Sequence, residues 1–297
     1  MNKNLISHRD AEAQRKTYLF IILSVSVPLW LIIFYSNVYA SAWMQTEGDS
    51  LIATGTSYSI ADSFWKRDGK LAQYSTRHKQ GVYYLYGEYG YSYYYNIFAS
   101  TGWTYSDNGT STDSGVDDVK IGIRGRLNLF RNGRTWEIAA ILPTRKWYLS
   151  DYRPGQGKYG LEAGIFYRFR PNPYENPFAE YPHSIWGGGL GTTLRSGGVG
   201  GEVWGYGNWQ KNLFSPLWKI EIKLSALSSF AGAETGSVDI YGPNDSFHYD
   251  QISSDISLSY SLSRTTGINL SYKQDLWGRN INKNETVHAG IYTTWKK

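Results

Sequence analysis

Residues 117–130 read Asp-Asp-Val-Lys-Ile-Gly-Ile-Arg-Gly-Arg-Leu-Asn-Leu-Phe, and most odd positions from 119 to 129 hold valine, isoleucine or leucine. The even positions hold most of the polar side chains, namely Lys120, Arg124, Arg126 and Asn128. A repeat of two residues predicts a β-strand whose two faces meet different surroundings. The apolar face needs an apolar neighbour, whereas the basic face needs water or counter-charges.

Comparable alternating stretches recur after Trp43, separated by segments rich in turn-forming residues. No segment in this part is apolar for long enough to form a membrane-spanning helix, and none keeps a helical period. The pattern predicts an all-β fold, a transmembrane antiparallel up-and-down β-barrel of about twelve strands, in the outer membrane of a Gram-negative-type bacterium. We expect strands at 50–60, 80–89, 93–105, 116–130, 134–143, 158–169, 183–194, 201–211, 217–229, 249–262, 266–277 and 285–295.

The connections between these strands alternate in length. We expect long polar loops on one side of the membrane, at 61–79, 106–115, 144–157, 230–248 and 278–284, with 195–200 as a short exception. The opposite side has short turns, including a hairpin at Asn132-Gly133, because both residues tolerate a positive φ. Residues 170–182 contain four prolines and predict a stiff excursion on the short-turn side. This asymmetry is typical of outer-membrane barrels.

The N-terminal residues 1–42 resemble an export signal. A basic start is followed by an apolar stretch from Tyr18 to Tyr35 and then by small residues suited to cleavage before Trp43. The alternative is an uncleaved membrane helix, since the apolar stretch approaches the ~20 residues that a span needs. We expect the signal peptide to occupy 1–42 and the barrel 43–297.

Composition excludes several classes of site. The 297 residues include no cysteine, so there is no disulfide framework, thiolate zinc site, catalytic thiol or lipid-modified cysteine. Aromatic residues make up 16% of the chain, as expected where tyrosine and tryptophan form girdles at two membrane interfaces. A net charge of +5 is too mild to indicate nucleic-acid binding.

The cost of exposing charge to lipid determines which face points outward. A lysine or arginine at the middle of the lipid-facing surface costs ~2–4 kcal/mol, so reversing 117–130 would cost roughly 6–12 kcal/mol. The apolar residues therefore face lipid and the charged residues face the lumen. The predicted lumen-lining residues are Lys120, Arg124, Arg126, Glu137, Glu162, Arg168, Glu202, Lys219, Glu221, Lys223, Asp255, Lys273, Asp275 and His288.

Neighbouring strands bring opposite charges together. We expect Glu202 on a strand beside Lys219, Glu221 and Lys223, and Asp255 near Lys273. These charges could line a narrow hydrophilic passage and set its selectivity, or could neutralise one another and fill the lumen. About eight strands leave room only for side chains, and about 16–18 leave an aqueous channel, so twelve strands allow both interpretations.

Enzymatic and metal sites are poorly supported. An outer-membrane lipid hydrolase would need a serine paired with a histidine, and His288 with Ser271 from the adjoining strand is the one combination we consider. No histidine pair or carboxylate cluster has the spacing of metal ligands. The glycines at 187–191 lack the lysine and helix of a phosphate loop, and instead predict a close backbone approach in a strand. We expect no cofactor, no metal and no enzymatic activity.

Four short stretches carry two resemblances to known sequences. Gly115–Leu127, the Ile-Leu-Pro-Thr ending at Thr144, and Gly155–Gly164 resemble a family of outer-membrane proteins named for the meta-pathway of phenol degradation, which are regarded as transporters of aromatic compounds. The last strand, from His288 to Trp295, resembles the C-terminal signal read by barrel-assembly machinery. It departs from that signal in Thr293 and in the two lysines that follow Trp295.

These observations together predict passive diffusion of small, aromatic or hydrophobic solutes through a charged constriction, with no energy coupling. The alternative is a closed barrel that serves as a scaffold or binds partners through its outer loops. The expected partners are outer-membrane lipid, the assembly machinery during insertion and a small-molecule solute. The oligomeric state stays open.

Overall fold

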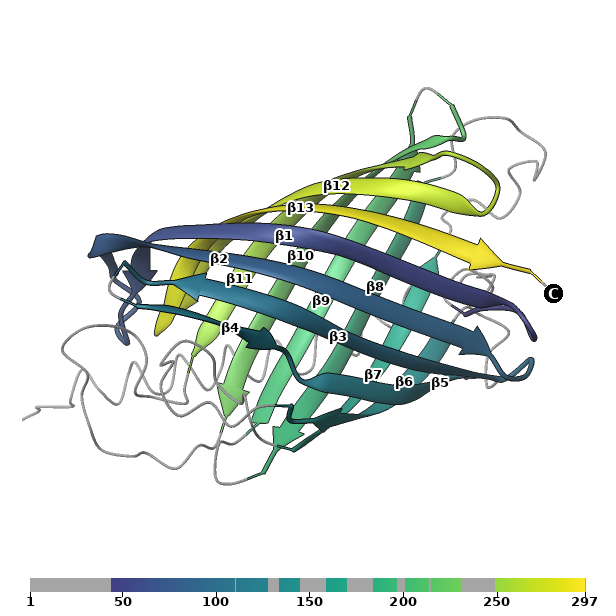
Figure 1. The fold of residues 1–297 in the computed structure, drawn as a ribbon, viewed down its shortest axis with the longest axis horizontal. Coiled ribbons are helices and arrows are strands. Elements are labelled where there is room, and N and C mark those ends of the chain that lie inside the picture. The colour runs from purple at the N-terminus through teal and green to yellow at the C-terminus, as the bar shows by residue number, and fades with distance from the viewer. Residues whose placement is uncertain are drawn as a thin grey trace, which may run out of the picture. The chain divides into compact units, whose positions relative to one another are not determined.

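The computed structural model describes residues 44–109, 111–127, 134–144, 159–169, 184–196, 201–213, 215–230 and 249–296. They form one closed antiparallel β-barrel (Figure 1). Its strands are β1 (Ser50–Trp65), β2 (Leu71–Gly90), β3 (Tyr95–Asp107), β4 (Thr112–Val116), β5 (Val119–Arg126), β6 (Arg134–Leu142), β7 (Gly160–Phe169), β8 (Ser184–Arg195), β9 (Gly201–Asn212), β10 (Trp218–Phe230), β11 (Asp250–Ser261), β12 (Thr266–Arg279) and β13 (Ile281–Trp295). In these ranges no helix is both long and apolar enough to cross a membrane.

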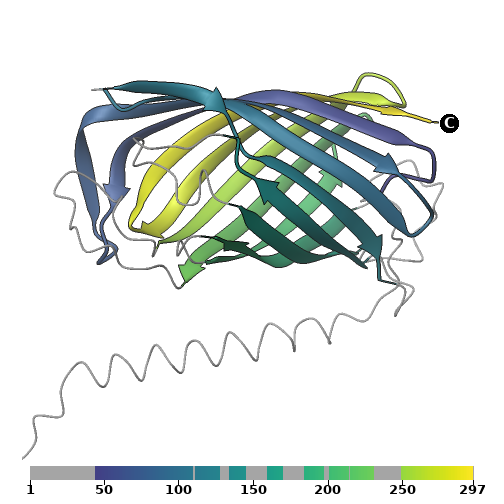
Figure 2. The ribbon, with the colours of Figure 1, turned by 60° about the horizontal axis from the view of Figure 1, so that its bottom comes forward.

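The barrel closes between its first and last strands. Each strand pairs with its neighbour in sequence, and β1 also pairs with β13 from Ser50 opposite Trp295 to Trp65 opposite Ile281. Because β4 and β5 both pair with β3, they form the two halves of one barrel strand, so the wall has twelve strands as predicted. Figure 2 shows these strands crossing the wall obliquely, as closure of a sheet requires.

The two faces of the wall differ in chemistry. On the outer face, Ile123 and Leu224 are 47% and 55% exposed. Facing inward on the same strands, Arg124 and Lys223 are partly buried. Exposed aromatic residues lie near both ends of the barrel, including Tyr91, Trp186 and Trp295 near the short turns and Trp103, Tyr105 and Trp277 near the opposite end. This arrangement matches an apolar band flanked by two aromatic girdles.

Three predicted outer loops are wrong, because the strands continue through them. Predicted loop 61–79 is largely strand, with only residues 66–70 between β1 and β2. Loop 106–115 is a hairpin between β3 and β4, and loop 278–284 narrows to Asn280 between β12 and β13. Beyond the apolar band both faces of a hairpin meet water, so its residues lose the alternation that marks a strand.

The predicted strand 116–130 is interrupted at Asp117-Asp118. In β4, Val116 lies opposite Trp103 of β3, and in β5, Lys120 lies opposite Ser100 of β3. The chain from Val116 to Lys120 therefore contains one residue more than the facing segment of β3. Outward-facing residues are therefore even-numbered in β4 and odd-numbered in β5, as Val116 and Ile121 show. The Thr104 hydroxyl donates to Asp117 Oδ2 at 2.6 Å, which holds the bulge against the adjacent strand.

Several predictions fall wholly or largely outside the described residues. They are the signal peptide at 1–42, the Asn132-Gly133 hairpin, the outer loops 144–157 and 230–248, and the proline-rich segment 170–182. The predicted short connections that are described include Ser263-Arg264-Thr265 between β11 and β12, which is a turn in the structure.

Candidate functional site

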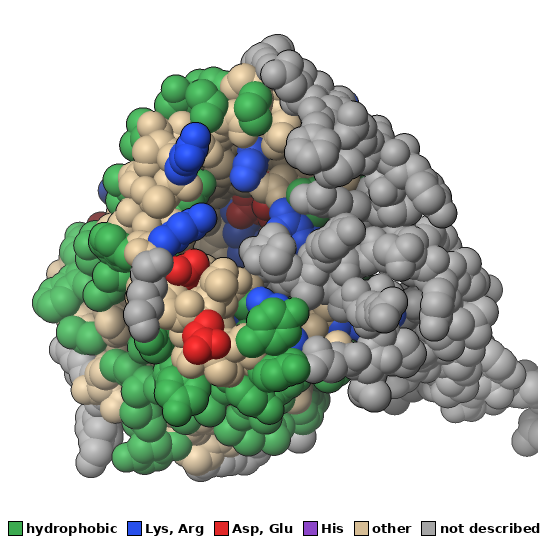
Figure 3. Space-filling view, turned by 90° about the vertical axis from the view of Figure 1, so that its right-hand side faces the viewer, with side chains coloured by type: hydrophobic (Ala, Val, Ile, Leu, Met, Phe, Trp, Pro, Cys, Tyr) green, Lys and Arg blue, Asp and Glu red, His purple; other side chains and the backbone are tan. Residues whose placement is uncertain are grey.

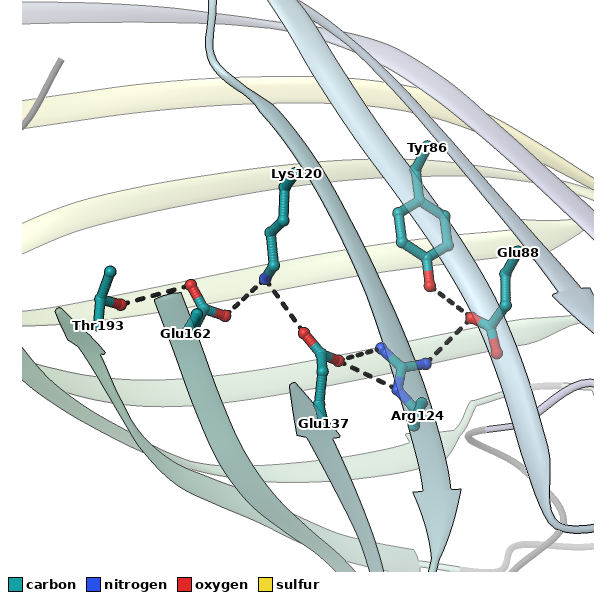
Figure 4. A network of polar contacts seen from close by, with 7 residues as sticks. All are labelled: Tyr86, Glu88, Lys120, Arg124, Glu137, Glu162 and Thr193. Carbon is teal, nitrogen blue, oxygen red and sulfur yellow. Dashed lines mark hydrogen bonds and ion pairs between the residues drawn. The ribbon is translucent and has the colours of Figure 1, made fainter. Parts of the chain in front are cut away.

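An ion-pair network crosses the inner wall from β2 to β8 (Figure 4). At its centre Arg124 on β5 contacts two carboxylates, Glu137 Oε2 at 2.8 Å and Glu88 Oε2 at 3.0 Å. Glu137 also lies 3.1 Å from Lys120 Nζ, which in turn is 2.5 Å from Glu162. Two basic side chains thus join three carboxylates on β2, β6 and β7.

Neutral polar groups complete both ends of this network. Tyr86 donates its hydroxyl proton to Glu88, and Asn96 Nδ2 donates to the second oxygen of the same carboxylate at 2.5 Å. At the other end, the Thr193 hydroxyl donates to Glu162 at 3.4 Å. The carboxylates of Glu88 and Glu137 are nearly inaccessible, with side-chain exposures of 2% and 5%. Burial of this depth requires the counter-charges, because an unpaired carboxylate here would lose its hydration without replacement.

The strand registers place every predicted lumen-lining residue on the inward face of the barrel. These residues do not form one cluster. Lys120, Arg124, Glu137 and Glu162 meet in the network above. Glu202 lies opposite Ser229, far along the strand from Lys219 and Lys223, and instead accepts a hydrogen bond from the Tyr249 hydroxyl. Glu202 is thus on the strand beside these lysines, as predicted, but at the opposite end of the pairing.

A second row of charges crosses β10 to β12. The register sets Asp255 directly between Lys223 and Lys273, as predicted for Asp255 and Lys273. Lys273 Nζ is also 3.9 Å from Asp275 Oδ1. The other carboxylate oxygen of Asp275 accepts from the backbone N–H of Asn284 at 2.9 Å and from its side-chain amide at 3.1 Å. In this row two lysines, Lys223 and Lys273, alternate with the carboxylates of Asp255 and Asp275.

Basic side chains gather at the end of the barrel with the short turns. Arg126 lies over the Tyr93 ring at 4.2 Å, and Arg168 Nη2 donates to Gln210 at 2.9 Å. Lys219 is the inward residue at the start of β10. Figure 3 shows this end as a hollow with Lys and Arg side chains around it and Asp and Glu side chains among them. The arrangement would place positive charge where a solute enters or leaves.

Aromatic residues on the inner wall were missed by the sequence analysis. Phe166, Trp204 and Tyr206 share the inward face with Arg168 and Glu202. Two signals could have revealed these aromatic residues. They alternate in step with the inward-facing charged residues of the same strands. The neighbouring strand also has inward glycines at 189 and 191, which leave room for large rings.

The geometry around His288 differs from that of a nucleophile–base pair. Ser271 lies directly opposite His288 in register, but His288 Nε2 is hydrogen-bonded with the Tyr84 hydroxyl at 2.7 Å. No cluster of three or more metal-ligating side chains occurs in the part of the chain that the structure describes.

Comparison with known proteins gives similarity of fold only. No family model and no curated protein matches the sequence. The structure is similar to the COG4313 outer membrane channel from Pseudomonas putida F1, with a TM-score of 0.59 and 12% identity over 87% of this chain and 100% of that one. Weaker similarities include the NanC porin, with a TM-score of 0.44 and 9% identity over 82% of this chain and 98% of that one. The translocator domain of the autotransporter NalP from Neisseria meningitidis has a TM-score of 0.42 and 10% identity, covering 96% and 97%.

The fold and its surface define the class of protein. A closed twelve-stranded barrel, apolar outside and charged within, is an outer-membrane β-barrel of the kind found in Gram-negative bacteria. Its fold is similar to that of the COG4313 outer membrane channel. The resemblance to the phenol-degradation family is not confirmed by any family match.

Proposed function

We propose that this barrel is a passive channel for small solutes across the outer membrane. The observation that carries the proposal is the hollow at the short-turn end, around which charged side chains lie (Figure 3). Water and charged groups stabilise one another in such an interior, so polar solutes can enter without exposure to lipid. The protein with a TM-score of 0.59 to this chain is itself described as an outer membrane channel.

The ion-pair network supports a passage through the lumen that is bounded on one side by the wall of β2 to β7. Lys120 and Arg124 are held by three carboxylates against the wall of β2 to β7, so they add little free charge to the interior. The opposite wall, from β10 to β13, carries hydroxyl groups such as Ser225 and Ser253, whose oxygens are 2.9 Å apart. Shorter side chains occupy less of the interior, so the region around these serines supports a solute path beside this wall.

The solute class follows from the sequence resemblance alone. Members of the phenol-degradation family are regarded as transporters of aromatic compounds, and we extend that expectation to small aromatic or hydrophobic solutes here. Outer-membrane lipid around the apolar band, and the assembly machinery during insertion, are the partners that this function requires.

The absence of cysteine permits a direct test of the passage. Ser225→Cys places a thiol on the inner face, while Ala226→Cys places one on the outer face of the same strand. In planar bilayers the full-length protein should give steady conducting steps. A charged methanethiosulfonate reagent should reduce the current of the Ser225→Cys variant and leave Ala226→Cys unchanged.

Two results would contradict the proposal. Silence of the purified, correctly folded protein in the bilayer would favour the closed barrel, a scaffold or loop-mediated binding protein. An equal response of the two thiol variants would place the ion path outside the lumen.

A further inference from the structure

Three aromatic rings form a patch on the inner wall, on β7 and β9. The ring centroids of Phe166 and Trp204 are 5.7 Å apart, and those of Phe166 and Tyr206 are 6.4 Å apart. None of the three side chains is fully buried. Part of each ring therefore stays accessible from the interior, unlike aromatic residues in the core of a soluble domain.

Glycines beneath the rings set their orientation. A Cβ atom at Gly191 would lie 2.3 Å from Trp204 Cζ2, and one at Gly189 would lie 2.6 Å from Phe166 Cδ1. The rings thus cover the backbone of β8 at positions where any side chain would collide with them. One face of the aromatic patch lies against the wall, so a solute would meet the patch from the interior, beside the Lys223 ammonium that lies over the Tyr206 ring.

Cations adjoin the patch on its short-turn side. Phe166, Gly189, Tyr206 and Ser225 form one register row across β7 to β10, and the next row contains Arg168, Gly187, Asn208 and Lys223. Lys223 Nζ lies 4.5 Å from the centre of the Tyr206 ring. The Lys223 ammonium therefore lies against the patch, while Arg168 starts from the adjoining row and directs its guanidinium to Gln210 in the row beyond.

Carboxylates near the patch have partners of their own. Glu221 accepts a hydrogen bond from Asn208 at 3.1 Å, and Asp255 lies between Lys223 and Lys273 in register. On the far side of the rings, Glu162 is paired with Lys120, and Glu202 accepts a hydrogen bond from the Tyr249 hydroxyl. On the short-turn side, the adjoining row contains three cations, Arg168, Lys223 and Lys273, and one carboxylate, Asp255. This distribution favours an anionic group on the short-turn side of the rings.

We propose that Phe166, Trp204 and Tyr206, together with Arg168 and Lys223, form a binding subsite for small organic anions that carry a flat ring. The ring of the solute stacks on the aromatic patch, and its carboxylate meets the cations beside it. Aromatic carboxylates and sugar acids share this chemistry, because a planar ring and the C–H face of a pyranose chair both stack on aromatic side chains and each molecule carries a carboxylate. The subsite rests on the proposed channel, since the solute must reach the interior.

The test compares four probes on the full-length protein: benzoate, glucuronate, acetate and benzylammonium. Calorimetry in detergent micelles measures binding, and block of the current in planar bilayers measures occupancy of the passage. We expect benzoate or glucuronate to bind roughly tenfold more tightly than acetate and benzylammonium. If benzoate binds more tightly than glucuronate, the natural ligand is an aromatic carboxylate. If glucuronate binds more tightly, the natural ligand is a sugar acid.

Matched variants separate the subsite from general effects on the barrel. Trp204→Leu should weaken binding of the preferred probe about tenfold by removing a stacking ring, whereas Trp186→Leu on the outer face should not change it. Lys223→Gln should weaken binding of the carboxylate several-fold, while Lys70→Gln in the exposed β1–β2 turn should have no effect.

The outcomes distinguish this inference from the channel itself. If the protein conducts but binds all four probes equally, or if Trp204→Leu binds as the parent does, the subsite is refuted and the channel stands. If the preferred probe binds in micelles to a barrel that does not conduct, the subsite stands and the channel is refuted.

Discussion

Tyr84 on β2 reaches His288 on β13 across the intervening strand β1, with 2.7 Å between the tyrosine hydroxyl and His288 Nε2. The register sets Tyr84, Gly55 and Gly290 side by side. A Cβ atom at Gly55 would lie 2.5 Å from the Tyr84 hydroxyl oxygen, and one at Gly290 would lie 2.4 Å from it. The contact between the first and last strands of the barrel therefore depends on two positions without a side chain.

Gly290→Ala tests this dependence. The added methyl group forces Tyr84 away from His288, and we expect the free energy of unfolding to fall by ~1–3 kcal/mol, as is usual for overpacking. Urea titration in micelles measures the change. The same substitution should have a smaller effect in a Tyr84→Ala background, since the two positions are in contact. Gly87→Ala, where a Cβ would meet nothing within 4 Å, is the control and should be neutral.

Glu137→Gln removes the carboxylate shared by Lys120 and Arg124. Losing one partner of a buried ion pair costs ~3–5 kcal/mol where the site is dry. Because the Lys120 side chain is 27% exposed, we expect about 2 kcal/mol here. Asp62→Asn breaks an ion pair with Arg77 in which both side chains are more than half exposed, and it should change stability by less than ~1 kcal/mol. Equal losses in the two variants would show that the network adds no stability.

We expect a charge introduced on the outer face of β10 to destabilise the barrel more than a charge introduced on its inner face. Leu224 lies at the middle of the strand and is 55% exposed, so Leu224→Arg should reduce the free energy of folding into lipid vesicles by ~2–4 kcal/mol. The adjacent inward change, Ser225→Arg, keeps its charge away from lipid and should be tolerated far better. A larger loss for Ser225→Arg would invert the assignment of the two faces.

The turn between β12 and β13 depends on its single residue. Asn280 has a φ of 55°, a left-handed conformation that asparagine tolerates and β-branched residues avoid. We expect Asn280→Val to reduce stability by about 1–2 kcal/mol, measured by thermal unfolding in micelles. Asn280→Gly, which accepts the same backbone conformation, should be close to neutral. If both variants unfold alike, the backbone conformation at this turn is not what stabilises it.

The sequence predicted the barrel and its two faces because lipid imposes a strict alternation where the strands cross it. Residues 119–126 show this directly, since Ile121 and Ile123 are outside and Arg124 is inside. Above the membrane that constraint ends, so the hairpin extensions of β1, β2 and β3 were mistaken for loops. The bulge at Asp117-Asp118 was also hidden, because one inserted residue changes the parity without changing the composition.

The site was predicted by residue type but not by arrangement. Parity alone identifies Lys120, Glu137 and Glu162 as inward-facing, yet their mutual contacts depend on strand register and tilt, which one sequence does not specify. The register of β9 against β10 keeps Glu202 away from Lys223, although the two residues lie on neighbouring strands as predicted. Inward aromatic residues such as Trp204 were overlooked because large apolar side chains were assigned to lipid by default.

The ion-pair network joins strands that are not adjacent. Main-chain hydrogen bonds link each strand only to its neighbours, whereas Arg124 on β5 reaches Glu88 on β2 past the intervening β3. Side-chain charges on Arg124 and Glu137 therefore cross-brace this sector from within. Such bracing is ionic, but Glu88 and Glu137 are nearly inaccessible, so electrolyte screens these pairs far less than it screens the exposed pair of Arg77 and Asp62. Concentrated salt should therefore leave this flank intact, giving the cylinder a mechanically stiff side.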